Sequence, residues 1–480
     1  MRLFDSFENG IREFIPVKEG YVHMYVCGLT PYDNMHIGHL RTYVFFDVVR
    51  RYFEHKGYTV IYVQNITDVE DKIFNRAKEL NVHPLKLADD NARTAYYEME
   101  KMNILRPTFV VKVSEEIPAI ISLIQRIIDN GYAYVSGGDV YFSISKFHRY
   151  GRLSRQKLDE LMAGVRVEPG ENKRNPLDFA LWKKSDENVA VFNSPWSIGR
   201  PGWHIECSAI STKYLGETID IHGGGRDLIF PHHENEIAQS ESATGKKFVN
   251  YWMHTGFLTI NGEKMSKSLG NFITAADVLG KYSPNVIRWY MLTRHYRSPI
   301  DFSYAYLDEI VKHFERIDST IEFARVYAQR DVIGPDISDD IKRLVAEFHD
   351  AMDDDFDTPR ALASVNEIVR MINLHIRENS ASGRSIYTAI TELINLLTIL
   401  GFSVVLKEDG KYVKLLTDVC KKYSVDVEQD LFYIVEGLFA KRDELRKEKR
   451  YAESDEIRAA IKKAGIVVED MGKQSIWRRG

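Results

Sequence analysis

The sequence predicts a doubly wound α/β fold on a parallel sheet, with an insertion inside it and an all-helical C-terminal region after it. Three observations support this prediction. The first 65 residues follow the order strand, glycine-rich turn, helix, strand, as in a βαβ unit. A strand-like run at residues 219–222 is followed by three glycines and a helical pattern, which repeats that order. From about Tyr304 the strand patterns fade and amphipathic helical patterns replace them.

The first half of the predicted sheet lies within residues 21–64. Residues 21–27, YVHMYVC, are rich in aromatic and β-branched side chains and predict a strand. Residues 40–53 carry apolar side chains at helical spacing, and residues 58–64, YTVIYVQ, predict a second strand after Gly57. Two strands joined by a crossover helix pair in parallel.

The insertion is predicted at about residues 110–195. Residues 114–131 predict a helix with Ser114 as its N-cap and Gly131 at its end. Two short strands, YAYV and DVYFS, follow it, after which the chain returns to the sheet. Beyond the sheet, helical spacing recurs, for example in Ile341, Leu344, Val345 and Phe348.

Composition narrows the class of protein. The chain has 480 residues, of which 44% are hydrophobic and 28% charged, so we expect a globular protein of roughly three domains. No apolar run reaches about 18 residues and the N-terminus does not resemble a signal peptide, so we expect a cytoplasmic protein without a membrane span. Its three cysteines, Cys27, Cys207 and Cys420, are too few for a disulfide framework. The net charge of −5 does not by itself indicate a nucleic-acid partner.

A first candidate site is the turn CGLTPYDNMHIGH, which contains His36, Gly38 and His39 at the start of the first predicted helix. Helix N-termini attract phosphate, and two imidazoles there can donate to phosphate oxygens. Gly38 leaves room for a base or ribose to approach the backbone. The alternative is a pair of ordinary surface histidines.

A second candidate site is NGEKMSKSLGN at residues 261–271, with Lys264 and Lys267 between two glycines. Such a loop can bring two ammonium groups onto a triphosphate. The alternative is a solvated basic turn. The chain has neither GxxxxGK[ST] nor GxGxxG, so any nucleotide chemistry follows another design.

A third candidate site is the pair His232 and Glu236 in LIFPHHENEIAQSE. Side chains four residues apart share one face of a helix. Two ligands do not hold a zinc ion, which usually takes four, so distant residues have to complete any such site.

These motifs together resemble a known family. HIGH at residues 36–39 and KMSKS at 264–268 on a doubly wound sheet resemble a class I aminoacyl-tRNA synthetase. YVCGLTPYDNMHIGH, NITDVEDKI, WHIECSA, DIHGGGRDLIFPHHENEIAQSE, HTGFLTINGEKMSKSLGN and MDDDFDTPRA resemble the cysteinyl-tRNA synthetases, in that family's order and spacing. Leu29 and Pro31 depart from the family's expected Gly-Pro-Thr-Val, and the last 80 residues match loosely.

The resemblance implies an enzyme that activates L-cysteine with ATP and transfers it to the 3′-terminal adenosine of tRNA(Cys). It implies one zinc ion per chain, which selects the substrate thiolate without an editing domain, and Mg²⁺ with ATP. The implied zinc ligands are Cys27, Cys207, His232 and Glu236. The implied ATP-binding and catalytic residues are His36, Gly38, His39, Gly225, Asp227, Lys264 and Lys267.

The implied amino-acid pocket contains Gly28, Thr67 and Trp203, although Trp203 could equally be a core aromatic. For tRNA we expect contacts from the tail, in Lys473, Trp477, Arg478 and Arg479, because aromatic and basic side chains alternate there. The alternative for Trp477 is a residue tucked into the last helix. We expect a monomer.

The expected domains are a Rossmann-type catalytic domain in two halves, a connective insertion, the KMSKS loop with a stem-contact region, a helical bundle and an anticodon-binding domain. Their ranges are 1–110 and 196–255, 111–195, 256–303, 304–400 and 401–480. Two other functions stay open: a cysteine ligase acting on an amino-sugar with the same catalytic body, and a non-catalytic zinc-dependent nucleic-acid-binding protein.

Overall fold

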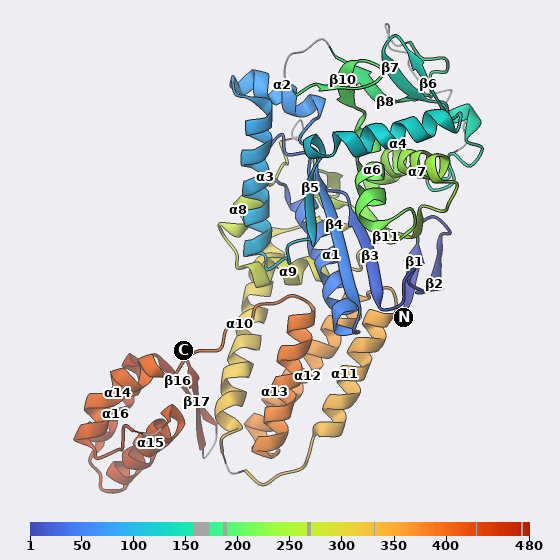
Figure 1. Ribbon diagram of the computed structural model, residues 1–480. Helices are drawn as coiled ribbons and strands as arrows, with labels where there is room; N and C mark the ends of the chain where they lie inside the picture. The colour runs from blue at the N-terminus through green and yellow to red at the C-terminus, as the bar shows by residue number, and fades with distance from the viewer. Residues whose placement is uncertain (157–171, 186–189, 266–269, 331, 429, 472–473) are drawn as a thin grey trace. The chain divides into compact units, whose positions relative to one another are not determined.

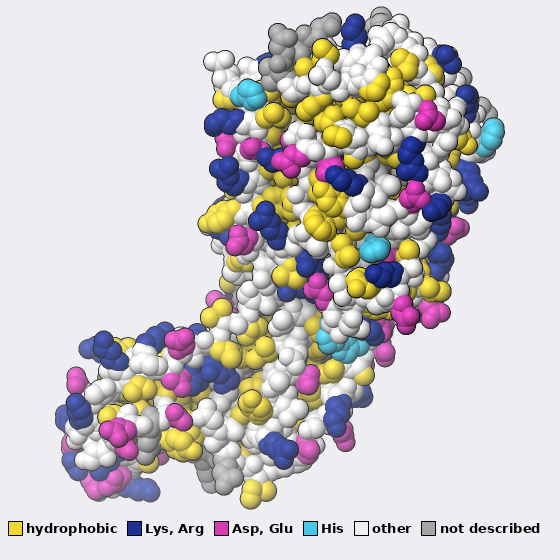
Figure 2. Space-filling model, in the orientation of Figure 1, with side chains coloured by type: hydrophobic (Ala, Val, Ile, Leu, Met, Phe, Trp, Pro, Cys, Tyr) yellow, Lys and Arg dark blue, Asp and Glu magenta, His cyan; other side chains and the backbone are white. Residues whose placement is uncertain are grey.

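The computed structural model describes residues 1–156, 172–185, 190–265, 270–330, 332–428, 430–471 and 474–480. The chain forms two compact units. The first comprises residues 1–307, 351–359 and 399–401, and the second comprises residues 308–350, 360–398 and 402–480. None of the helices in the described parts of the chain combines the length and the apolar character that a membrane span requires. On the face drawn in Figure 2, basic and acidic side chains are interspersed over the surface.

The first unit is built on a five-stranded parallel sheet (Figure 1). Its spatial order is β12-β11-β3-β4-β5. The strands are β3 (Tyr21–Val26), β4 (Thr59–Ile66), β5 (Phe109–Lys112), β11 (Ile219–Gly225) and β12 (Val249–Thr255). The chain fills the sheet from β3 toward β5, then returns to the other side of β3 with β11. The order therefore reverses between β3 and β11, and ligands bind at such a reversal, beyond the carboxyl ends of the strands.

Helices cover both faces of this sheet. Helix α1 (Ile37–His55) packs with α8 (Ala275–Leu279) and α9 (Pro284–Leu292). On the other face α4, α6 and α7 pack on one another and share a core with Tyr25, Val63 and Trp252. These helices span Ile117–Asp129, Trp203–Leu215 and Glu234–Thr244, and α2 (Asp71–Leu80) and α3 (Pro84–Lys101) connect β4 to β5. The doubly wound fold predicted from the sequence is confirmed.

The insertion adds a second, antiparallel sheet of order β6-β7-β8-β10-β9. Its strands are Ala133–Ser136, Asp139–Phe142, Phe179–Lys184, Ile198–Pro201 and Phe192–Asn193, in that order. The preceding helix α4 begins at Ile117, later than predicted, and Ser114 is not its N-cap. Instead the Ser114 N–H and hydroxyl both donate to the Asp68 carboxylate, at 3.0 and 2.5 Å, because a short 3₁₀ turn at Val113–Glu115 precedes the helix.

Smaller sheets complete the first unit. Strands β1 (Arg2–Asp5) and β2 (Gly10–Glu13) form an N-terminal hairpin. A three-stranded sheet of order β14-β13-β15 follows β12, with strands Glu263–Lys264, Leu258–Ile260 and Ile300–Phe302. This small sheet carries the chain into the KMSKS segment.

The second unit is helical, as predicted, and ends in a hairpin that the sequence did not predict. Its helices are α10 (Tyr304–Tyr327), α11 (Ser338–Asp353), α12 (Thr358–Glu378), α13 (Gly383–Ile399), α14 (Gly410–Lys422), α15 (Leu431–Lys447) and α16 (Tyr451–Lys463), the ends of some of which lie in the first unit. Strands β16 (Ile466–Met471) and β17 (Gln474–Arg479) pair antiparallel and place Val468 opposite Trp477. The six-part division of the chain stays a prediction.

Candidate active site and metal centre

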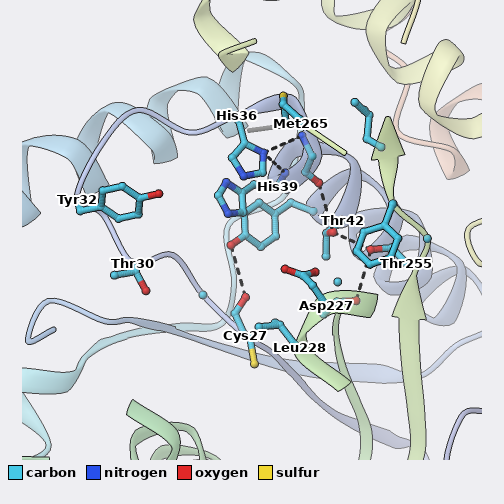
Figure 3. A pocket seen from close by; sticks show the side chains of 18 of the residues that line it. Cys27, Thr30, Tyr32, His36, His39, Thr42, Asp227, Leu228, Thr255 and Met265 are labelled. Carbon is cyan, nitrogen blue, oxygen red and sulfur yellow. Dashed lines mark hydrogen bonds between the residues drawn. The ribbon is translucent and has the colours of Figure 1, made fainter. Parts of the chain in front are cut away.

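A cavity of about 320 Å³ lies at the reversal point of the parallel sheet. Cys27, the residue after β3, and Gly225, the last residue of β11, both line it. The turn before α1 and the segment after β12 form further walls. Figure 3 shows His36, His39 and Asp227 around this cavity, with Cys27 on the side opposite the two histidines. The fold thus brings residues from four separate parts of the chain to one crevice.

The HIGH turn forms the N-terminus of α1. His36 is the N-cap, and its Nδ1 accepts from the N–H groups of Gly38 and His39 at 3.1 and 3.3 Å. Because Nδ1 accepts, the proton of the neutral ring lies on Nε2. The His36 and His39 rings stack with centroids 3.7 Å apart. Burial, and the repulsion that protonation of the adjacent His36 would add, hold the pKa of His39 well below its usual value, so His39 is neutral and can donate a hydrogen bond without carrying charge.

The opposite wall of the cavity carries Asp227 and Trp203. Asp227 lies in a 3₁₀ turn directly after β11 and directs its carboxylate into the cavity (Figure 3). Trp203, the first residue of α6, is 37% exposed and lines the cavity rather than the core. Its ring lies 4.4 Å from the His232 ring, so the indole connects the cavity to the predicted metal ligands.

The four predicted zinc ligands lie together and are buried. Cys27 Sγ is 3.8 Å from Glu236 Oε1, Cys207 Sγ is 3.6 Å from His232 Nε2, and His232 Nε2 is 3.0 Å from Glu236 Oε1. One donor atom from each of the four lies within 4.8 Å of the others. His232 belongs to a π-type turn at Ile229–His233, and α7 begins only at Glu234.

These residues fit a zinc ion. Zn–S bonds of about 2.3 Å and Zn–N or Zn–O bonds of about 2.0–2.2 Å in a tetrahedron separate the ligand atoms by about 3.4–3.8 Å. The sulfur-to-oxygen and sulfur-to-nitrogen distances above fall at that spacing, and the nitrogen-to-oxygen distance is slightly shorter. Two thiols, an imidazole and a carboxylate form a donor set that suits zinc.

The protonation of the cluster also favours a cation. Burial raises the pKa of Cys207, but the hydrogen bond with Cys27 and contact with His232 outweigh burial and lower it to about 6. Burial raises the pKa of Glu236, whereas His222 and His232 lower it to about 2. For His232, burial lowers the pKa and the Glu236 charge raises it to about 10. The negative neighbours of His232 therefore favour a positive charge at this position, and a metal ion would take the place of the His232 proton, because a ligand histidine binds in its neutral form.

Four further histidines lie at or beside the cluster, and the sequence reasoning assigned no role to three of them, His204, His222 and His254. His204 Nδ1 is 2.9 Å from His232 Nδ1. His222 Nε2 is 2.7 Å from Glu236 Oε2, and His233 Nδ1 is 2.8 Å from His254 Nε2. Cys27, His222, His233 and Glu236 form a second set of donors close enough for a metal. His222 is the last residue of the strand-like run 219–222 and directly precedes three glycines. This position was the signal in the sequence that could have marked His222 as a site residue.

Gly28 and Thr67 lie next to the metal cluster. The Gly28 N–H donates to Asn65 Oδ1 at 2.8 Å, and a Cβ on Gly28 would lie 1.5 Å from the Asn65 carbonyl oxygen. Thr67 is buried, and its hydroxyl bonds Asn65 Nδ2 at 2.9 Å and Glu206 Oε2 at 3.0 Å. Only glycine therefore fits after Cys27, and the Thr67 hydroxyl is engaged with protein groups.

The KMSKS segment is described in part. Lys264 ends β14, and Met265 lines the cavity 3.7 Å from the position of a Cβ on Gly38. The predicted ATP contact Lys267 lies outside the described residues.

The tail differs from the prediction at two of the expected tRNA contacts, Trp477 and Arg479. Trp477 is fully buried in the core of the second unit, and its Nε1–H donates to Glu436 at 3.0 Å. Arg479 is also buried and pairs with Asp409. The prediction that Trp477 stacks on an RNA base therefore disagrees with the structure, because hairpin pairing turns the indole inward. Arg478 is partly exposed and Lys473 lies outside the described residues.

Comparisons with known proteins agree with this fold. The catalytic-domain model of class I (C) tRNA synthetases matches residues 13–312, the DALR domain matches 347–402, and the cysteinyl-tRNA ligase anticodon binding domain matches 429–478. A methionyl-tRNA synthetase structure from Mycobacterium tuberculosis shares the fold, with a TM-score of 0.59, 14% identity, and 79% of this chain and 90% of that chain covered. The sheet, its crevice and the two motifs define a class I aminoacyl-tRNA synthetase.

Full-length relatives narrow the class to one family. A cysteine–tRNA ligase of Thermococcus gammatolerans is 45% identical, covering 100% of this chain and 99% of the relative. A cysteine–tRNA ligase of Carboxydothermus hydrogenoformans is 44% identical, covering 100% of both. The chain belongs to the cysteine–tRNA ligase family and is an enzyme. The match at residues 429–478 argues against the amino-sugar ligase, which does without an anticodon-binding domain.

Proposed function

We propose that the chain activates L-cysteine with ATP at the cavity between β3 and β11 and transfers it to the 3′-terminal adenosine of tRNA(Cys). The cysteine carboxylate attacks the α-phosphorus, the bond to the bridging oxygen breaks, and pyrophosphate leaves. A ribose hydroxyl of the terminal adenosine then attacks the carbonyl carbon of the adenylate, and AMP leaves. No covalent bond to the enzyme forms in either step.

One observation carries the choice of cysteine: Cys27 both lines the cavity and belongs to the buried four-residue donor cluster. A zinc ion held by Cys27, Cys207, His232 and Glu236 would bind the substrate sulfur as a thiolate in preference to the harder, less acidic hydroxyl of serine. Apolar contacts alone discriminate side chains that differ this little by only about 10- to 200-fold.

The nucleotide would lie along the α1 side of the cavity. His36 and His39 would donate to phosphate oxygens, aided by the positive end of the α1 dipole. Gly38 and Gly225 leave space beside the ribose and base, and the Asp227 carboxylate would accept hydrogen bonds from vicinal ribose hydroxyls. Mg²⁺ would accompany the ATP phosphates.

The remaining proposed roles concern the β- and γ-phosphates, the amino acid and the tRNA. Lys264 and Lys267 would neutralise charge on the β- and γ-phosphates as pyrophosphate leaves. Gly28 and Trp203 would border the amino acid, with Thr67 ordering the backbone behind them. For the second unit, Arg478 and Lys473 remain proposed RNA contacts.

Zinc analysis tests the proposal without relying on activity. Purified protein should contain about one zinc per chain, and Cys207→Ser should lower zinc retention and cysteine-dependent ATP–pyrophosphate exchange. Cys420→Ser is the matched control, because Cys420 is also buried but lies in the core of the second unit. Full zinc content in the Cys207 variant would end the assignment of the metal site.

A further inference from the structure

Arg41, on α1 just beyond the HIGH turn, is a buried arginine bonded to main-chain carbonyl groups. It is 2% exposed. Its Nη1 donates to the carbonyls of Gly256 and Phe257, both at 2.8 Å. Its Nη2 donates to those of Ser298 at 2.5 Å and Tyr296 at 3.4 Å. Among the described residues, every acceptor of its hydrogen bonds is a carbonyl, so the guanidinium organises backbone rather than neutralising an acid.

Two of these carbonyls, those of Gly256 and Phe257, lie at the start of residues 256–275, the segment that contains KMSKS and is called the arm below. Gly256 and Phe257 connect β12 to β13, line the cavity, and lead through β14 to Lys264. Ser298 precedes β15, which pairs in parallel with β13. One side chain on α1 therefore holds the two segments that enter the small sheet.

The other end of the arm is bonded to the same helix. The Ile37 N–H donates to the Ile273 carbonyl at 3.2 Å, and the Ala275 N–H donates to the Met35 carbonyl at 2.8 Å. Before the arm, the hydroxyls of Thr42 and Thr255 bond at 2.8 Å (Figure 3). The chain thus leaves α1 at about residue 256 and returns to it at 273–275, so both ends of the arm are bonded to α1 or to the turn before it.

The segment that supplies the third and fourth carbonyls is itself held in place. The carboxylate of Asp355 accepts from the Tyr296 hydroxyl and from Arg297 Nε, both at 2.8 Å. The 256–257 connection is bonded to this segment as well, because the Gly256 N–H donates to the Tyr296 carbonyl at 2.7 Å and the Ile300 N–H to the Phe257 carbonyl at 3.0 Å. A change at Arg41 should therefore alter the spacing between α1 and both segments.

We propose that Arg41 is a positioning residue for adenylate formation, which sets the spacing between the HIGH histidines and the base of the KMSKS arm. This rests on the proposed function of the cavity. Removing the guanidinium takes the Arg41 donor from the carbonyls of Gly256 and Ser298, which lets the spacing to α1 shift or admits water. The carbonyls of Phe257 and Tyr296 keep a second donor, the N–H groups of Ile300 and Gly256. A displacement of about 1 Å in groups that orient reactants can lower a rate by about 10²-fold.

Arg51 offers a matched control on the same helix. It is largely buried, and it bonds Asp47 at 2.9 Å and the Asn103 carbonyl at 2.7 Å. Asp47 also keeps Arg288 and the Leu105 N–H as partners, so Arg51→Met leaves no carboxylate unpaired. Arg51→Met therefore measures how much Tm and kcat fall when α1 loses an arginine that lies away from the cavity.

The experiment compares Arg41→Met, Arg41→Lys and Arg51→Met in cysteine-dependent ATP–pyrophosphate exchange, with thermal unfolding of each full-length chain. We expect Arg41→Met to lower kcat at least about tenfold with the KM for cysteine within about threefold of wild type. Arg41→Lys should be intermediate, and Arg51→Met should keep the wild-type kcat. Millimolar guanidinium should partly restore kcat in Arg41→Met and leave Arg51→Met unchanged.

Two results would overturn the proposal. One is a kcat in Arg41→Met equal to that of Arg51→Met. The other is a loss of kcat in Arg41→Met that is proportional to its loss of Tm and that added guanidinium does not restore. If Arg41→Met does not fold, Arg41→Lys decides, and a wild-type kcat there refutes a positioning role. Wild-type protein without cysteine-dependent exchange would instead contradict the proposed function itself.

Discussion

Gly28→Ala should disable the metal centre through backbone displacement alone. The new Cβ would lie 1.5 Å from the Asn65 carbonyl oxygen and 2.6 Å from its carbon. Carbon and carbonyl oxygen in contact lie about 3.3–3.6 Å apart, so the end of β3 or β4 has to move by about 2 Å. The hydrogen bond from the Gly28 N–H to Asn65 is then lost, and the neighbouring Cys27 moves with it.

The expected consequence is a loss of about 10² in kcat/KM for cysteine activation, together with weaker zinc binding by about 10- to 100-fold. The assays are exchange kinetics and zinc release to a chromogenic chelator. Gly10→Ala is the control, because a Cβ there meets nothing within 4 Å. If Gly28→Ala retained zinc and kcat/KM like Gly10→Ala, the geometry described for the end of β3 would be refuted.

Three further predictions concern other parts of the chain. Trp477→Ala removes a fully buried indole and should destabilise the second unit by about 3–5 kcal/mol, so tRNA charging should fall while ATP–pyrophosphate exchange stays near wild type; equal losses in both assays would contradict this. Asp227→Asn should shrink the preference for ATP over 2′-deoxy-ATP in exchange kinetics, and an unchanged preference would remove Asp227 from the ribose. Lys267→Ala should lower kcat for adenylate formation by about 10² or more with little change in cysteine affinity, and an unchanged kcat would reduce the loop to a surface turn.

Local sequence patterns predicted the sheet well because its strands and helices are long or strongly periodic. The strand–helix–strand order of residues 21–64 appears as β3, α1 and β4, and the glycine run after residue 222 ends β11. The N-cap of α4 was predicted two residues too early, because Ser114 has the chemistry of an N-cap but bonds Asp68 instead. The hairpin of β16 and β17 was missed because aromatic and basic residues at the chain end matched an exposed RNA-binding pattern equally well.

The candidate site depended on more than local pattern. His232 and Glu236 are close in sequence, but Cys27 and Cys207 lie 180 residues apart, and only the resemblance to a family joined them to the pair. The structure added His204, His222 and His254, which contact His232, Glu236 and His233, respectively. The contacts of Arg41 could not be predicted, because main-chain carbonyls leave no trace in a sequence.

The central claim is that the buried Cys27, Cys207, His232 and Glu236 cluster selects cysteine through a metal. The most direct measurement is ATP–pyrophosphate exchange with cysteine and with serine, on zinc-loaded wild type and on Cys207→Ser. We predict a ratio of kcat/KM values of at least about 10⁴ in favour of cysteine for wild type, falling toward about 10- to 200-fold in the variant. A wild-type ratio within that lower range, or an undiminished ratio in a variant shown to lack zinc, would contradict it.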